Sequence, residues 1–186
     1  NDTDNATYNS IEAVRLGVKQ VQGTFNGLGE RCGNSNLVNV AANLILKMNY
    51  ECKLKKKINK ITSASRLIDE ILNRQSSRNL PFVGSAAFAH KGGLHISAVE
   101  KNPKSYEHID PISVGNERLL VVSNQSGKSN VVNKLKKFRI DIKGKEKKIE
   151  EFLELIKNQE SLGFAYDGAE ASFELLSRRT FQNFKE

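Results

Sequence analysis

The most chemically suggestive stretch of this sequence runs from Gly27 to Asn34 and reads GLGERCGN. Its glycines let the backbone pass close to a ligand, because glycine carries no side chain and tolerates positive φ angles. Glu30 and Arg31 can form an ion pair, and Asn34 offers a side-chain amide oxygen beside a predicted helix start. An amide oxygen can bind Mg²⁺, Mn²⁺ or Zn²⁺ when carboxylates and imidazoles complete the coordination sphere. Taken alone, the segment is either a tight structural loop or a site for an anion or a metal ion.

All three histidines fall within residues 81–115, a stretch whose prolines and glycines are typical of a loop. His90 and His95 are five residues apart, which would separate them by roughly 140° around a helix, so they do not form a metal-binding pair on one face. The glycine pair between them also argues against a helix. We interpret His90 as a structural or supporting residue and His108 as a hydrogen-bonding residue of the surface.

Two other motifs resemble ligand sites but fail on spacing. The run GKS at 127–129 looks like the end of a phosphate-binding loop, but that motif requires a glycine where this sequence has Val122. Cys32 and Cys52 form no CxxC pair and, with the histidines, match no standard zinc-ligand spacing. The sequence therefore predicts neither a nucleotide site nor a zinc site of this kind, and the absence of a disulfide framework favours a reducing, cytoplasmic location.

The elements that carry the glycine-rich segment follow an α/β pattern. Residues 6–18 predict an amphipathic helix, and residues 20–24 predict a short strand. After the glycines, the polar residues 34–36 can cap a second helix, whose apolar face covers residues 37–48. A helix, a strand, a loop and a helix in this order are typical of an α/β domain.

Beyond a lysine-rich linker at 53–57 the sequence becomes mostly helical. Apolar residues at helical spacing predict further helices, and residues 121–122 predict a short strand. The helices are expected around Ile58–Leu72, Val131–Phe138 with Ser126 as its cap, Ile149–Ile156 and Ala169–Phe181. We therefore place a domain boundary near residue 52, between an α/β piece at 1–52 and a helical region at 53–186.

The composition is that of a soluble globular protein, with 38% hydrophobic and 27% charged residues. No run approaches the roughly 18 apolar residues that a membrane helix needs, and the opening Asn1-Asp2 starts no signal peptide. Because the single methionine is Met48, the amino terminus is expected to be processed or truncated. The net charge of +8 leaves nucleic-acid binding open, but the lysines are spread widely and few aromatic residues lie near them to stack on bases. A solvated lysine-rich surface, with neither a nucleic-acid nor a membrane partner, is the simpler interpretation.

Three segments at the start of the chain resemble the end of the catalytic barrel of the isopropylmalate synthase family. They are Asn1-Asp2, the run VQGT at 21–24 and the run GLGERCGN at 27–34. The resemblance identifies the first pair with the last two residues of an H-x-H-N-D motif, so both metal-binding histidines would precede Asn1. It further implies that Asn34 binds the catalytic divalent metal. Gly29, Glu30 and Arg31 would form the loop that faces the substrate.

The remainder of the chain resembles the helical subdomains of the same family. The matching blocks are AFAHKGGLH at 87–95, NPKSYEHIDP at 102–111, VGN at 114–116, SNQSGKSN at 123–130 and GAEASFELL at 168–176. The resemblance implies an α/β fold, in which the carboxy-terminal piece of a TIM (β/α)8 barrel is followed by a mostly helical subdomain region that precedes a regulatory domain. The sequence VQGTFNGLGERCGNSNL at 21–37 is most similar to that of the citramalate synthase type.

The resemblance also implies an activity. Enzymes of this family are acyltransferases that condense acetyl-CoA with a 2-oxo acid. For this sequence pyruvate is the expected 2-oxo acid, giving citramalate in branched-chain amino-acid biosynthesis, and isopropylmalate or homocitrate synthesis is the alternative. A divalent metal ion (Zn²⁺, Mn²⁺ or Mg²⁺) would polarise the keto oxygen.

A base must remove a methyl proton from acetyl-CoA, and histidine suits this role because it titrates near neutral pH. The family places such a histidine in the helical subdomain, from which it reaches into the barrel of the partner subunit. The matching residue here is His95, and the arrangement implies a homodimer. Without the resemblance, the alternative that His95 only packs its loop stays open.

A non-catalytic role is a further alternative. The chain could serve as a dimerisation or regulatory module, because a piece of a barrel exposes strand edges and apolar helix faces that favour association. If both histidines of the metal site precede Asn1, we expect the isolated 186-residue chain to show no condensation activity. Turnover of acetyl-CoA and pyruvate by that chain alone would contradict this expectation.

Overall fold

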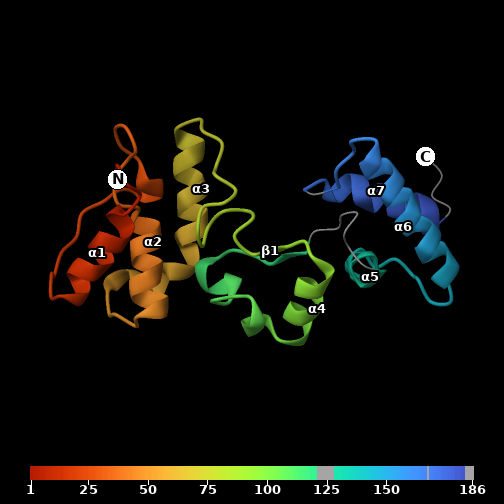
Figure 1. Cartoon of the computed structure of the whole chain (residues 1–186), viewed down its shortest axis with the longest axis horizontal. Helices are drawn as coiled ribbons and strands as arrows, with labels where there is room; N and C mark the ends of the chain where they lie inside the picture. Colours follow the sequence, from red (N-terminus) through yellow and green to blue (C-terminus); the bar gives the residue numbers. More distant parts are fainter. Residues whose placement is uncertain (121–127, 167, 183–186) are drawn as a thin grey trace. The chain divides into compact units, whose positions relative to one another are not determined.

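The computed structural model describes residues 1–120, 128–166 and 168–182 (Figure 1). Contacts divide the chain into two compact units, one formed by residues 1–88 and 108–118 and the other by residues 89–107 and 119–186. Each unit is mostly helical and has its own apolar core. The boundary near residue 52, which separates the expected barrel piece from the expected subdomains, stays a prediction.

The first unit is built from α-helices joined by short 3₁₀ and π-helical segments. Its elements are α1 (Ala6–Arg15), the 3₁₀ turn η1 (Phe25–Gly27), α2 (Leu37–Ala42), the π-helical turn η2 (Asn43–Lys47), the 3₁₀ segment η3 (Lys53–Lys60), α3 (Ile61–Ile71) and the 3₁₀ turn η5 (Pro111–Val114). Helices α1 and α2 lie side by side (Figure 1). The core is formed by Val38, Ala42, Ile45, Ile58, Ile61, Phe82, Val83, Phe88 and Val114.

Local signals explain where these helices begin and end. The capping predicted for residues 34–36 is confirmed at Asn36, whose side-chain oxygen accepts a 3.0 Å hydrogen bond from the backbone N–H of Val38. Helix α1 ends at Arg15, before the predicted end, and Gly17 beyond it adopts a left-handed φ of 107°. The helix predicted over 37–48 is present, but it widens into η2 after its first six residues.

The strand predicted over residues 20–24 is wrong. Within the part of the chain that the structure describes, only Thr24 of this segment pairs, through an isolated parallel bridge to Asn36. Its N–H donates to the carbonyl of Ser35 at 3.0 Å, and its carbonyl accepts from the N–H of Leu37 at 2.9 Å. A strand needs neighbouring backbone along its whole length, and the described residues supply it at one position.

The second unit combines a minimal parallel sheet with four α-helices in its described residues. Its elements are β1 (Ala89–His90), α4 (Gly93–Lys101), the 3₁₀ turn η4 (Pro103–Ser105), β2 (Leu119–Leu120), α5 (Lys128–Lys137), α6 (Glu146–Ser161) and α7 (Glu170–Phe181). Strands β1 and β2 pair in parallel, with Ala89 opposite Leu119. The core is formed by Val131, Leu135, Ile140, Ile149, Phe152, Ile156, Tyr166, Phe173 and Phe181.

The helices predicted near the end of the chain are confirmed. Helix α6 buries Ile149, Phe152 and Ile156 on one stripe, as their spacing predicts, and α7 buries Phe173 on the facing side of the same core. The predicted cap at Ser126 and the predicted strand at 121–122 lie outside the described residues.

The prediction that residues 81–115 form a loop is wrong for α4. This helix begins at Gly93, with Gly92 in an extended conformation at its N-cap, and it buries Ile96 and Val99. Glycine disfavours helix interiors but is well tolerated at the N-cap. The glycine pair therefore marks the start of a helix, and the prediction that it argues against a helix is wrong.

Several surface features bear on the predicted class of protein. The thiols of Cys32 and Cys52 are free and exposed. The lysine-rich residues predicted as a linker belong to η3, which buries Ile58 in the core of the first unit. Across the described ranges, no helix is both long enough and apolar enough to cross a membrane.

Candidate functional site

The glycine-rich loop at 27–34 is closed by its own backbone. The N–H of Asn34 donates to the carbonyl of Gly27 at 3.0 Å, and the N–H of Gly33 donates to the carbonyl of Glu30 at 2.8 Å. Gly33 has a left-handed φ of 82°, and a Cβ atom there would lie 2.1 Å from the carbonyl oxygen of Gly27. Glycine is therefore required at this position, and the predicted tight loop is confirmed.

The loop also orients the side chain of Asn34. Its amide nitrogen donates to the carbonyl of Leu28 at 3.0 Å. Gly29 leaves the space for this amide, since a Cβ atom on Gly29 would lie 2.4 Å from the Asn34 nitrogen. Because the nitrogen is engaged with the loop, the side-chain oxygen is the atom that can bind a cation.

The ion pair predicted between Glu30 and Arg31 is replaced by a pair with Asp2. One guanidinium nitrogen of Arg31 lies 2.9 and 3.1 Å from the two carboxylate oxygens of Asp2. The segment that carries Asp2 is held by Asn1, whose side-chain oxygen accepts a 3.0 Å hydrogen bond from the N–H of Ala6. Both members of the pair are exposed, so its contribution to stability is small.

The polar groups of this loop line a cavity of about 480 Å³. Its lining residues are Asn1, Asp2, Glu30, Arg31, Gly33 and Asn34. Among the residues that the structure describes, no three His, Cys, Asp or Glu side chains gather as metal ligands would. The loop therefore offers the side-chain oxygen of Asn34 as one possible cation ligand.

His95 lies in the first turn of α4, in the second unit, and its side chain is exposed. Its imidazole packs against the ring of Tyr106, with ring centroids 4.4 Å apart and planes tilted by 32°. The backbone of Gly92 also lies near the ring, since a Cβ atom there would be 3.7 Å from the imidazole Cγ. The imidazole is therefore exposed, and Tyr106 and the Gly92 backbone both lie close to it.

His90 is held by a buried carboxylate. Its Nε2 lies 3.1 Å from a carboxylate oxygen of Glu107, and the two side chains are 10% and 3% exposed. Its ring also meets the ring of Tyr106 edge to face at 6.5 Å. These contacts agree with the interpretation of His90 as a supporting residue.

His108 has a different environment, in the first unit. Its imidazole packs edge to face on Phe82 at 5.1 Å and stacks on Phe88 at 5.9 Å. Partial burial lowers the pKa of His108 below its usual value of 6.5, and the positive charge of Lys47 lowers it further. Its backbone carbonyl also accepts a hydrogen bond from the ammonium group of Lys47. His108 is exposed, as predicted, and its ring also packs against Phe82 and Phe88 of the core.

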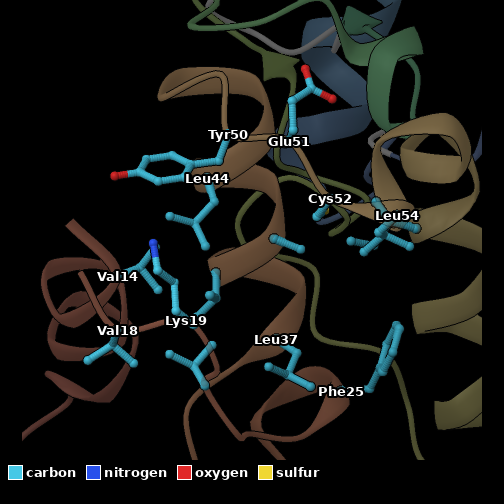
Figure 2. Close-up of a pocket in the computed structure, with 14 residues that line it drawn as sticks. Val14, Val18, Lys19, Phe25, Leu37, Leu44, Tyr50, Glu51, Cys52 and Leu54 are labelled. Atoms are coloured by element: carbon cyan, nitrogen blue, oxygen red, sulfur yellow. The ribbon is translucent and has the colours of Figure 1, made fainter. Parts of the chain in front are cut away.

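A second cavity of about 470 Å³ lies in the first unit, and it is apolar (Figure 2). Figure 2 shows Val14 and Val18 of the α1 region on one side, and Leu37 and Leu44 of the α2–η2 helix among the side chains around it. Lys19 and Glu51 are the charged residues that line it. Because the remaining lining is almost entirely apolar, this cavity is not the candidate catalytic site.

Sequence reasoning missed Tyr106 and Glu107. The quoted block NPKSYEHIDP contains both, but nothing in a single sequence indicates that Tyr106 packs on His95, 11 positions earlier. An acidic residue is also usually exposed, so the burial of Glu107 is the reverse of the default expectation.

Two family models match consecutive parts of the chain. The model described as HMGL-like matches residues 1–68, and the model described as homocitrate synthase post-HMGL domain-like matches residues 82–162. Among curated proteins, the (R)-citramalate synthase of Synechocystis is 50% identical over 179 residues, which cover 96% of this chain and 33% of that protein. The chain belongs to the 2-isopropylmalate synthase and homocitrate synthase family. The resemblance seen in the sequence motifs is confirmed.

Other members of this family agree with the assignment. The (R)-citramalate synthase of Aquifex aeolicus is 46% identical over the whole of this chain and 35% of its own length. A 2-isopropylmalate synthase of Parabacteroides distasonis is 37% identical over 83% of this chain and 32% of its own length. The chain thus spans about a third of the length of the curated relatives it matches. Proteins with an HMGL-like domain belong to a TIM-barrel family and use a divalent metal ion.

Proposed function

We propose that this chain is part of an acyltransferase that condenses acetyl-CoA with pyruvate to give citramalate. The observation that carries the proposal is the 50% identity to an (R)-citramalate synthase over nearly the whole chain. The 37% identity to a 2-isopropylmalate synthase makes that reaction the second candidate. Either product would serve branched-chain amino-acid biosynthesis. Citramalate would be a precursor of isoleucine, and isopropylmalate would be a precursor of leucine.

Residues 1–52 would form the end of a TIM barrel, and residues 53–186 the helical subdomains that follow it. The order of the two family matches, HMGL-like over 1–68 and then post-HMGL over 82–162, supports this order of the two parts. The single parallel bridge at Thr24 also fits a segment whose other strand partners belong to the rest of a barrel.

In the glycine-rich loop, Asn34 would hold the divalent metal through its side-chain oxygen. When bound, the metal would act as a Lewis acid on the keto oxygen of the 2-oxo acid. Gly29 keeps the amide in place by leaving room for it, and the Asp2–Arg31 pair and Glu30 line the same cavity. The loop would thereby present one oxygen donor and one guanidinium group to a small anionic substrate.

In the second unit, His95 would remove a methyl proton from acetyl-CoA. The resulting enolate would attack the keto carbon of pyruvate, and water would then cleave the thioester to release CoA and citramalate. The exposed position of His95 on the first turn of α4 supports this role, since the base must reach a bound substrate. In a homodimer, this turn would enter the active site of the partner subunit.

The proposal is tested on the full-length protein that carries this segment, purified and loaded with Mg²⁺, Mn²⁺ or Zn²⁺ in turn. Release of the CoA thiol is followed with pyruvate and with the 2-oxo acids whose condensation would yield 2-isopropylmalate and homocitrate. We expect kcat/KM to be highest for pyruvate. A higher kcat/KM for the isopropylmalate precursor would instead select the second candidate, and no CoA release with any of the three would reject the condensation.

A further inference from the structure

Residues 89–107 contain α4, and the two ends of this segment lie close together. His90 lies in β1 at one end of this segment, Glu107 lies at the other end, and their side chains share a 3.1 Å hydrogen bond. Both side chains are at least nine-tenths buried. A carboxylate at this depth carries a desolvation cost that hydrogen-bonding partners must offset, and the bond to His90 is a partner that also joins the two ends of the segment.

The hydrogen bond between His90 and Glu107 also fixes the position of Tyr106, whose ring contacts His95. Tyr106 immediately precedes Glu107, and the N–H groups of both residues donate to the carbonyl of Pro103, at 3.2 and 2.9 Å. The turn before them is capped by Asn102, whose side-chain oxygen accepts from the N–H of Lys104 at 3.2 Å. The Tyr106 backbone is thus anchored on both sides, and its ring lies 4.4 Å from the imidazole of His95.

We propose that His90 and Glu107 are positioning residues for His95: their hydrogen bond closes residues 89–107 around α4 and holds the Tyr106 ring against the imidazole. This rests on the proposed role of His95 as the base. An exposed histidine on a first helical turn has several rotamers, and the Tyr106 ring and the Gly92 backbone restrict them. Misplacement of a reacting group by about 1 Å can cost on the order of 10²-fold in rate.

The kinetic test uses three variants of the full-length protein. Glu107→Ala removes the anchor, and we expect kcat for condensation to fall on the order of 10²-fold while KM for pyruvate stays within about twofold. Glu107→Gln keeps an acceptor for His90 and is expected to retain kcat within about fivefold of the wild type. The matched control is Glu170→Ala, which removes the 2.9 Å partner of the buried Lys134 in the same unit and leaves residues 89–107 untouched. A wild-type kcat in Glu107→Ala, or an equal loss in Glu170→Ala, would overturn the proposal.

A double-mutant cycle tests whether Glu107 acts through Tyr106. If it does, the double variant Tyr106→Ala/Glu107→Ala loses no more kcat than the more damaged of the two single variants. If instead the kcat losses of the two single variants multiply in the double variant, Tyr106 and Glu107 act independently, and the proposed route is overturned.

A chemical measurement separates this proposal from the function itself. Diethyl pyrocarbonate modifies accessible imidazoles, and the modification rate of the His95 peptide can be followed by mass spectrometry without any condensation assay. We expect Glu107→Ala to raise this rate several-fold and Glu170→Ala to leave it unchanged. If condensation fails in the wild type but the rate responds in this way, the proposed function is wrong and the positioning stands. If condensation is present but the three rates are equal, the positioning is wrong.

Discussion

The glycine-rich loop at 27–34 and the segment 89–107 each present one candidate side chain, but they hold it in different ways. In the loop, the backbone closes through Gly33, and Gly29 makes room for the amide of Asn34. In the segment, a buried side-chain pair closes the ends, and a ring flanks His95. The first site therefore depends on glycines that carry no side chain, and the second depends on side chains that fill the space around His95. Adding a methyl group should damage the first, and removing a side chain should damage the second.

The largest effect is expected for His95→Ala in the full-length protein. Loss of a general base lowers kcat by about 10²- to 10⁴-fold, and the free energy of unfolding should stay unchanged because the side chain is exposed. The control is Leu94→Ala, its neighbour, which is 78% exposed and should keep the wild-type kcat. Steady-state kinetics and urea unfolding check both statements, and a wild-type kcat in His95→Ala would remove the base assignment.

The next largest effect is expected for Gly33→Ala, through stability. The new Cβ would be strained at φ 82° and would collide with the carbonyl of Gly27, so the free energy of unfolding should fall by roughly 3 kcal/mol. Gly144→Ala is the matched control, because Gly144 has a similar φ of 67° but open space around it, and strain alone costs about 1 kcal/mol. If urea unfolding shows the same loss of free energy of unfolding in Gly33→Ala and Gly144→Ala, the loop closure is not as tight as the backbone contacts indicate.

Gly29→Ala should weaken metal binding more than it weakens the fold. Its Cβ would displace the amide of Asn34, and loss of a group that orients a metal ligand typically costs about 10- to 100-fold in affinity. Calorimetric titration of the metal-free full-length protein measures this directly. Gly17→Ala, at a glycine with nothing within 4 Å, serves as the control and should bind the metal as the wild type does. Unchanged affinity in Gly29→Ala would exclude the amide as a ligand held by this glycine.

A smaller effect on stability is expected at Asn36, where the glycine-rich loop leads into α2. Asn36→Ala removes the cap of α2 and should lower the free energy of unfolding by about 1 kcal/mol. The exposed Ser63, whose hydroxyl donates to the carbonyl of Lys60, provides the control, and Ser63→Ala should change the urea midpoint little. If both variants unfold alike, the cap contributes nothing beyond an ordinary surface hydrogen bond.

The smallest effect concerns pH and His108. Its pKa is lowered in the folded state, mainly by burial, so the unfolded chain binds the proton more readily. Stability should therefore fall as the pH drops below about 6.5, the usual pKa of the group, and should recover above it. Urea midpoints of the wild type and His108→Gln at pH 5.5 and 7.5 test this. The variant should have the shallower dependence, and identical slopes would contradict the assignment.

Periodicity in the sequence predicted helices α6 and α7 well, because their apolar residues repeat at helical spacing over several turns and meet in one core. The glycine loop was also predictable, since its glycines sit where the backbone turns back on itself. The strand predicted at 20–24 is wrong for a physical reason: a short segment does not form a strand without neighbouring strands to pair with, and the described residues offer one bridge.

The segment around His95 was harder to predict. Gly92 and Gly93 read as a helix breaker, whereas Gly92 is the N-cap of α4 and Gly93 its first residue. The contacts to Tyr106 and to Glu107 join residues 11 and 17 positions apart, and only the fold brings them together. Motif resemblance named His95, but it gave no account of what holds that side chain.

The widened helical turn η2 has a consequence for chain length. The N–H of Met48 donates to the carbonyl of Asn43, five residues back, so this turn contains one residue more than an α-helical turn would. Deleting one residue between Asn43 and Lys47 would restore the narrower spiral and rotate everything after it by about 100° relative to α2. The lysine ammonium that now reaches the carbonyl of His108 would then face elsewhere. A relative that is one residue shorter here would need a different side chain to make that contact.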